Sequence, residues 1–204
     1  RTTSATLKGD IQSGKTPVDE LKKAVDLNEE MIDQATSFIQ QHYKNFSSMS
    51  WVYSCGAGAN YGTALESALK MGETIHIPSC CYEIEEYIHG PNLQLTPQYN
   101  VIFFDGNDGA SRRVEQVYKA TRKVTNRAYL ISNNPQLSRD GHVLSLSDTV
   151  SSELSPLVYL PFVQLLSFIV SNDLHSIYQH PLLKEFKAIA AAKTENFVNY
   201  DGDD

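Results

Sequence analysis

Cysteine is scarce in this chain: of its 204 residues only three are cysteines, and two of these, Cys80 and Cys81, are adjacent. Three cysteines do not make a disulfide framework, and the sequence has no CxxC pair of the kind that holds zinc. The composition therefore favours a reducing compartment, which is the cytoplasm.

The sequence also lacks a basic cluster. Its 17 Lys and Arg residues are outnumbered by 24 Asp and Glu, which gives a net charge of -7. Nucleic acids and anionic membranes bind through concentrated positive charge. Neither is therefore expected as a partner.

A long uninterrupted apolar run is missing as well. The most apolar stretch, Pro156–Val170, is broken by Pro161, Gln164 and Ser167, which predicts a buried helix rather than a membrane span. No signal-peptide pattern is visible at the start. The chain begins at Arg1 without a methionine, which indicates a fragment of a longer protein.

Residues 1–17 are polar with scattered glycines, and we expect them to form a linker or tail from a missing first domain. We assign residues 18–204 to a single domain with an N-terminal helix and a C-terminal tail. From Val18 to Tyr43 apolar residues recur at helical spacing. This predicts one long amphipathic helix, or two helices with a break near Leu27 and Asn28.

Short apolar runs alternate with helical patterns in the rest of the chain. Strands are expected in SWVYS, ETIHIP, YNVIFFD, NRAYLIS and HVLSLSD, and helices in YGTALESALKMG, SCCYEIEEYIHG, SRRVEQVYKATRKV and residues 156–172. Such alternation predicts an α/β fold, a three-layer α/β/α sandwich around about five parallel strands, the first at Trp51–Ser54. Ligands then meet the carboxyl ends of the strands, expected at Gly56–Asn60, Pro78–Cys81 and Asp105–Asp108.

The stretch GAGANYG invites comparison with dinucleotide-binding loops. Its glycine spacing does not fit GxGxxG, because Gly58 is followed by Gly62, and the second expected strand does not end in an acidic residue. The other interpretation is a sharp turn at Gly56 and Gly58 into a helix whose free N–H groups hold an anion.

Lys70 and Glu73 are spaced i and i+3 on an expected helix, so their side chains share a face. One interpretation is a surface ion pair, which contributes well under about 1 kcal/mol. The other is a proton-transfer pair, since a carboxylate beside a cation at a helix end is suited to that chemistry.

His89 is followed by Gly90 and Pro91, a pattern that is equally typical of helix capping and of a functional turn. Cys80 and Cys81 lie close by in the sequence, but no base is identifiable beside them, so neither is expected to be a nucleophile.

Three motifs occur together with the spacing of the sugar isomerase (SIS) domain family. They are Gly58-Ala59-Asn60-Tyr61, Ala64-Leu65-Glu66-Ser67-Ala68-Leu69-Lys70-Met71-Gly72-Glu73 and Glu86-Tyr87-Ile88-His89-Gly90-Pro91. From about Ser50 the chain resembles the second SIS domain of double-SIS enzymes, the isomerases of the glucosamine-6-phosphate synthase type and the deglycases of the fructoselysine-6-phosphate type. The resemblance implies the flavodoxin-like, Rossmann-like sandwich of that family.

The resemblance also implies roles for single residues. Glu73 falls at the base that moves a proton between sugar C1 and C2, and Lys70 at a lysine that supports this step. His89 falls at the histidine of ring opening, which the family donates to a neighbouring subunit. Lys193, in AAAKTENF, falls at a lysine of the C-terminal tail.

Substrate contacts are expected from four residues near the expected strand ends. These are Gly58, Asn60, Tyr61 and Cys80. The chemistry needs no metal or redox cofactor. The resemblance further implies a sugar phosphate as substrate and a homo-oligomer, dimeric or higher.

Two parts of the family pattern are not matched. The Ser/Thr-rich phosphate cradle belongs to the first SIS domain, and QSGKT at Gln12–Thr16 follows no strand. The glutaminase domain of the synthases is not matched either. We therefore expect this chain to be the C-terminal half of a longer enzyme, and the loop GNDGASRR favours the deglycase branch.

Two other functions stay open. One is a module that senses a phosphosugar without turning it over, and the other is a dimerisation platform. The presence of Lys70, Glu73 and His89 together favours the enzyme, because a sensor needs no base at C2.

Overall fold

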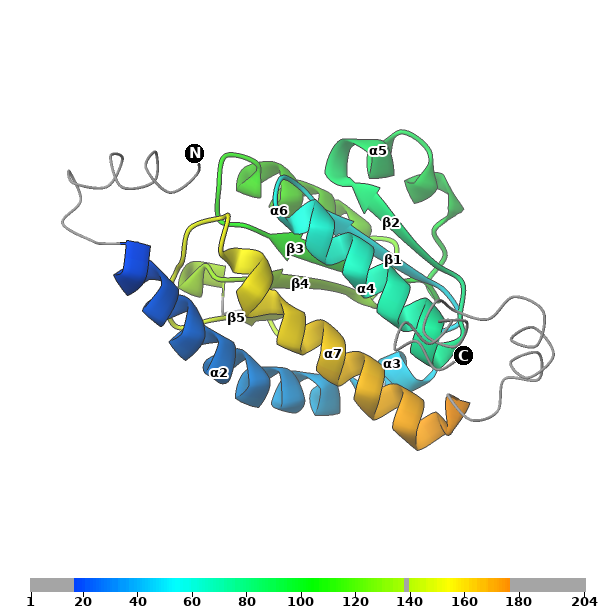
Figure 1. Cartoon of the computed structure of the whole chain (residues 1–204). Helices are drawn as coiled ribbons and strands as arrows, with labels where there is room; N and C mark the ends of the chain where they lie inside the picture. The colour runs from blue at the N-terminus through cyan, green and yellow to red at the C-terminus, as the bar shows by residue number, and fades with distance from the viewer. Residues whose placement is uncertain (1–16, 138–139, 177–204) are drawn as a thin grey trace, which may run out of the picture.

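A parallel sheet of five strands, in the order β2-β1-β3-β4-β5, forms the centre of the molecule (Figure 1). The structure, a computed structural model, describes residues 17–137 and 140–176. The strands are β1 (Val52–Gly56), β2 (Ser79–Glu83), β3 (Asn100–Asp105), β4 (Ala128–Ser132) and β5 (Val143–Ser145). Every neighbouring pair is parallel, which confirms the predicted sheet.

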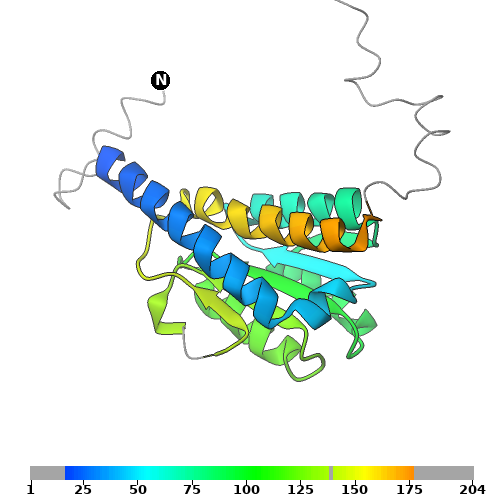
Figure 2. The same cartoon turned by 90° about the horizontal axis from the view of Figure 1, so that it is seen from below.

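Helices cover both faces of the sheet, so the three-layer sandwich is also confirmed. One face carries α2 (Pro17–Gln41), α3 (Tyr43–Ser47), α4 (Asn60–Ile75) and α7 (Ser155–Leu174). The other carries α5 (Ile84–Ile88) and α6 (Ser111–Thr121). Two short 3-10 helices, η1 (Pro91–Gln94) and η2 (Pro135–Leu137), complete the described chain. Figure 2 shows α7 lying between α2 and α4 on one side of the sheet.

The central strands are buried on both faces, which explains their continuous apolar sequences. All residues of β3 are buried. Because side chains alternate along a strand, Ile102 and Phe104 enter the core below α2, α4 and α7, whereas Val101 and Phe103 enter the core below α5 and α6.

The N-terminal helix is continuous. α2 buries Ala24, Leu27, Met31 and Ala35 on one side, so the stripe passes through the position where a break was considered. α7 is long and apolar enough to cross a membrane by length and composition alone. Its residues Val158, Phe162, Leu166 and Val170 are fully buried in the core, as predicted for a helix of the protein interior.

The second strand was predicted at the wrong place. ETIHIP is not a strand: α4 continues through Gly72 to Ile75, because Ile75 extends the buried stripe that includes Ala64, Ala68 and Met71. The helix ends only at His76, which takes the left-handed conformation with φ 61°. The strand that follows is Ser79–Glu83, a segment expected to be helical.

This shift changes one predicted ligand-binding edge. Pro78–Cys81 does not lie at the carboxyl end of a strand: Cys80 is the second residue of β2, opposite Tyr53 of β1. The carboxyl end of β2 is Glu83, whose side chain accepts a hydrogen bond from Glu85 N and caps α5.

Candidate functional site

The strand order reverses between β1 and β3, where α4 leaves β1 on one face and α6 leaves β3 on the other. Parallel sheets of this order bind ligands at such a point. Gly56 and Gly58 form the turn there as expected. A Cβ on Gly56 would lie 2.3 Å from Asn60 O, and Gly58 has φ +54°.

A hydrogen bond from the Asn60 side chain links this turn to the start of α7. Its Nδ2 donates to Ser155 Oγ at 2.7 Å, and its Oδ1 accepts from Thr63 Oγ1 at 3.0 Å. The side chain is buried. Both ends of the amide are thus engaged within the protein, which makes Asn60 a positioning residue in this conformation.

A buried polar network continues along the same edge. The Asp105 carboxylate accepts from Ser132 Oγ at 2.8 Å and from Asn107 N at 3.0 Å. Tyr159 Oη donates to Asp105 O at 2.6 Å and accepts from Asn133 N at 2.7 Å. Burial, followed by the nearby Asp105, raises the pKa of Tyr159, so the phenol stays protonated and keeps this donor role.

Asp108 also lies at the carboxyl edge of the sheet, next to Gly58. Its Oδ1 accepts from Ala110 N at 2.8 Å, and its own N–H donates to Ser111 Oγ at 2.7 Å, so a carboxylate stands in the turn directly before α6. A phosphate would compete with the Asp108 carboxylate for the Ala110 N–H group. The edge therefore suits hydroxyl donors better than an anion. Sequence analysis did not single out Ser132, Asn133 or Tyr159, although Ser132 ends the buried strand β4 and Asn133 directly follows it.

Lys70 and Glu73 lie together at the opposite edge of the sheet. α4 has 16 residues and is therefore about 24 Å long. It runs from the carboxyl edge of the sheet to the amino edge. At the amino edge Val52 N donates a hydrogen bond to Pro78 O, just before β2. Lys70 Nζ lies 2.9 Å from Glu73 Oε2 and 3.5 Å from Glu66 Oε1. The pair thus lies away from the carboxyl ends of the strands, where ligands were expected, because α4 connects the carboxyl end of β1 to the amino end of the parallel strand β2.

The electrostatics of Lys70 are set by these carboxylates. The hydrogen bond to Glu73 is the largest cause that raises the pKa of Lys70 above its ordinary value, against a smaller opposing effect of burial. Lys70 thus remains an ammonium at neutral pH and cannot act as a base. It can stabilise negative charge on a neighbouring oxygen.

His89 lies on the other face of the sheet from α4. It directly follows α5, its side chain is exposed, and its backbone N–H donates to Glu86 O at 3.1 Å. α5 packs with α6, whereas α4 packs with α7. A single chain thus brings Lys70 and Glu73 together but places His89 on a different face. Lys193 lies outside the described residues.

The residues expected to contact substrate are also divided. Gly58, Asn60 and Tyr61 lie in or just before the first turn of α4, whereas Cys80 is an exposed residue near the start of the edge strand β2. Cys81, on the side of β2 opposite to Cys80, is the first cause that raises the pKa of Tyr61. In the part of the chain that the structure describes, no three His, Cys, Asp or Glu side chains gather as metal ligands.

Known proteins with similar sequences share one activity. No protein-family model matches the chain. Glutamine–fructose-6-phosphate aminotransferase (isomerizing) of Xylella fastidiosa strain Temecula1 is 25% identical over 150 residues, which are 72% of this chain and 23% of that protein. The chain thus spans about a quarter of the length of the curated relatives that it matches.

Two solved structures with the same fold are described by names that refer to phosphosugars. A provisionally assigned phosphosugar isomerase from Clostridium difficile 630 has a TM-score of 0.72 and 19% identity, over 90% of this chain and 53% of that one. The C-terminal domain of glucosamine-fructose-6-phosphate aminotransferase from Francisella tularensis has a TM-score of 0.65 and 24% identity, over 76% and 44%. At these identities the likeness concerns the fold.

Proposed function

We propose that the chain is a member of the sugar isomerase (SIS) domain family that binds a sugar phosphate and takes part in aldose–ketose isomerisation, in the cytoplasm. The observation that carries the proposal is the contact between Lys70 and Glu73 at 2.9 Å, within the family motif. A base and a cation side by side are the two groups that such a proton shift requires.

Glu73 is the base in this proposal. Its carboxylate removes the proton from the carbon next to the carbonyl, C1 of a ketose or C2 of an aldose, and leaves an enediol or enolamine. The same carboxyl group returns the proton to the neighbouring carbon. Lys70, which stays cationic, stabilises the negative charge that develops on the enediol oxygen.

His89 opens the sugar ring by transferring a proton between the ring oxygen and the anomeric hydroxyl, and Lys193 is the second cation of the site. Lys70, Glu73 and His89 are partly or fully exposed in the single chain. Proton transfer of this kind benefits from a site that excludes water. We therefore place the complete site at a boundary with a second subunit or domain, in a homo-oligomer.

The amine-linked substrate is the more specific part of the proposal. In a deglycase the proton shift converts a ketoamine into an imine, and one water molecule then hydrolyses the imine to a free amine and an aldose 6-phosphate. The chain would be the C-terminal half of such an enzyme, with the phosphate held by the other half. The acidic edge at Asp105 and Asp108 supports this division.

Exchange of carbon-bound hydrogen tests the proposal. The natural full-length protein is incubated in D₂O with fructose 6-phosphate or with a fructosamine 6-phosphate, and C1 and C2 are followed by NMR. Incorporation of deuterium at either carbon is the expected result. Saturable binding of both compounds without any exchange would instead favour the sensing module, and the absence of binding and of exchange would overturn the proposal.

A further inference from the structure

The turn of α4 that carries Lys70 and Glu73 is at the end of the helix, where the backbone needs support from outside. The last four carbonyl groups of an α-helix have no partner within the helix, and in α4 they belong to residues 72–75. Helix ends fray unless other parts of the protein hold them. Glu73, the proposed base, thus lies where an unsupported backbone would let its carboxylate change position.

Ser176 supplies a hydrogen bond to this helix end. It comes two residues after the end of α7, and its Oγ donates to Thr74 O at 2.6 Å. A second acceptor, Ser171 O, lies farther from the hydroxyl, at 3.4 Å. A hydroxyl group has one proton to donate, and the shorter contact takes it. The carbonyl that receives it belongs to the residue directly after Glu73.

Thr74 connects the end of α7 to the backbone of Lys70. Its carbonyl accepts from Ser176, and its own Oγ1 donates to Lys70 O at 2.8 Å. On the buried side of the same turn, Met71 and Ile75 pack in the core that α4 shares with α7. The turn is thus held by packing on its inner side and by a hydrogen bond at its end. The ion pair that it carries stays on the outer side.

The backbone at the end of α7 is shaped for this contact. His175 takes the left-handed conformation, with φ 51°, which residues other than glycine adopt infrequently. The chain turns there after Leu174, and the next residue, Ser176, reaches α4. An unfavourable backbone conformation persists where the surrounding structure requires it, and such positions concentrate at functional sites.

We propose that Ser176 is a positioning residue of the isomerase site: its hydrogen bond to Thr74 O holds Glu73 in place beside Lys70 and toward the substrate carbon. The proposal rests on the role of Glu73 in the proposed function and adds a residue that follows α7. Proton transfer requires close alignment, and a displacement of about 1 Å can lower a rate about a hundredfold. A small shift of this turn is therefore enough to slow the reaction.

Hydrogen exchange at C1 or C2 of the sugar phosphate, by the natural full-length protein, tests the role of Ser176. Ser176→Ala should lower the exchange rate at saturating sugar phosphate at least about fivefold, because the base is misplaced. The half-saturating concentration should not change. Ser176→Thr keeps the hydroxyl and should retain the wild-type rate. Ser171→Ala is the matched control, since this hydroxyl donates within α7, to Phe168 O at 3.2 Å, and it should also leave the rate unchanged.

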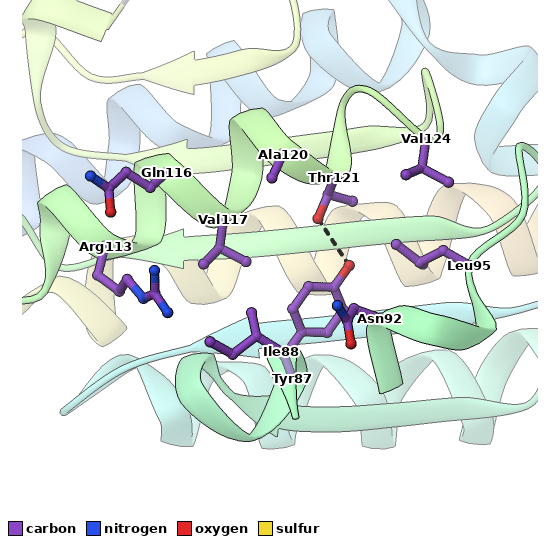
Figure 3. Close-up of a pocket in the computed structure, with 10 residues that line it drawn as sticks. All are labelled: Tyr87, Ile88, Asn92, Leu95, Arg113, Gln116, Val117, Ala120, Thr121 and Val124. Carbon is purple, nitrogen blue, oxygen red and sulfur yellow. Dashed lines mark hydrogen bonds between the residues drawn. The ribbon is translucent and has the colours of Figure 1, made fainter. Parts of the chain in front are cut away.

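The pKa of Lys70, followed by ¹³C NMR of its Cε, gives a second readout that does not depend on turnover. The hydrogen bond to Glu73 raises this pKa, so Ser176→Ala should shift it back toward the ordinary lysine value as the pair loosens. Thr121→Val is the control. It removes the 2.9 Å hydrogen bond between Thr121 and Tyr87, which joins α6 to α5 in a groove on the other face of the sheet (Figure 3). It should lower stability in urea but leave the pKa of Lys70 unchanged.

The outcomes separate this proposal from the proposed function. A wild type that binds sugar phosphates but exchanges no hydrogen would overturn both. Normal exchange by the wild type and by Ser176→Ala alike would overturn only the role of Ser176. The same pKa of Lys70 in the wild type and in Ser176→Ala would likewise contradict that role, whatever the change in stability.

Discussion

Lys70 and Glu73 form an ion pair of 2.9 Å across one turn of α4, at the amino edge of the sheet. The same lysine lies 3.5 Å from Glu66 on the preceding turn, so its ammonium is held between two carboxylates. A second Lys–Glu pair of the same helical kind, Lys119 with Glu115 at 3.0 Å, lies on α6 and serves as an internal reference.

The comparison of these two pairs yields the first prediction. Lys70→Met should lower the rate of hydrogen exchange into the sugar phosphate by about tenfold to a hundredfold, because the enediol loses its cation. Lys119→Met removes an equivalent surface pair and should change the rate by less than about twofold. Equal effects of both substitutions would mean that Lys70 acts only as a surface charge.

The turn at Gly56 gives a prediction on stability. Gly56→Ala should destabilise the protein by about 1–3 kcal/mol, because the added Cβ would lie 2.3 Å from Asn60 O. Gly72→Ala is the control: nothing lies within 4 Å of its Cβ, and alanine in a helix should stabilise by about 0.5–1 kcal/mol. Urea denaturation measures both. A neutral Gly56→Ala would show that the turn accommodates a side chain.

His142 gives a prediction on pH. Burial, then Arg122 and His42, lower the pKa of His142, while Asp140 opposes this change. The unfolded chain therefore binds the proton more readily, and stability should fall as the pH decreases below about 6.5. His142→Gln should flatten this slope in urea denaturation at stepped pH. The same slope in both proteins would assign the effect to other groups.

The strands that are buried on both faces were predictable from sequence. Val101–Phe104, for example, is a continuous apolar run of the kind that forms a central strand. The failure at ETIHIP has a physical cause: Ile75 and Ile77 alternate as in a strand, yet Ile75 also continues the helical stripe that packs against α7. Tertiary packing decided between the two patterns. The edge at which Glu73 lies follows instead from the order of elements, because a helix between two parallel strands ends at the amino edge of the sheet.

The hydrogen-bond network on the carboxyl edge could not be predicted from the sequence, because it joins residues that are far apart along the chain. Ser132 and Asp105 are 27 positions apart, and Tyr159 reaches Asp105 from 54 positions away. Such contacts depend on the order of the strands and on the placement of α7 over β3. The pair Lys70 and Glu73, by contrast, is local, and its contact could be predicted from helical spacing alone.

A shared site predicts complementation between subunits. Glu73→Gln and His89→Ala should each be inactive as pure proteins. If His89 serves the site of its partner, half of a 1:1 random mixture is mixed dimers with one intact site each, so about a quarter of the wild-type activity should return. Mixing without any recovery, in dimers shown to exchange subunits, would place both residues in the site of one chain.

The most direct measurement is the rate at which Glu73→Gln in the natural full-length protein exchanges hydrogen at C1 or C2 of the sugar phosphate with solvent. The account predicts a loss of at least about a hundredfold with sugar-phosphate affinity nearly unchanged. Glu66→Gln, which removes the other carboxylate beside Lys70, should exchange within about threefold of the wild type. Normal exchange by Glu73→Gln would contradict its assignment as the base.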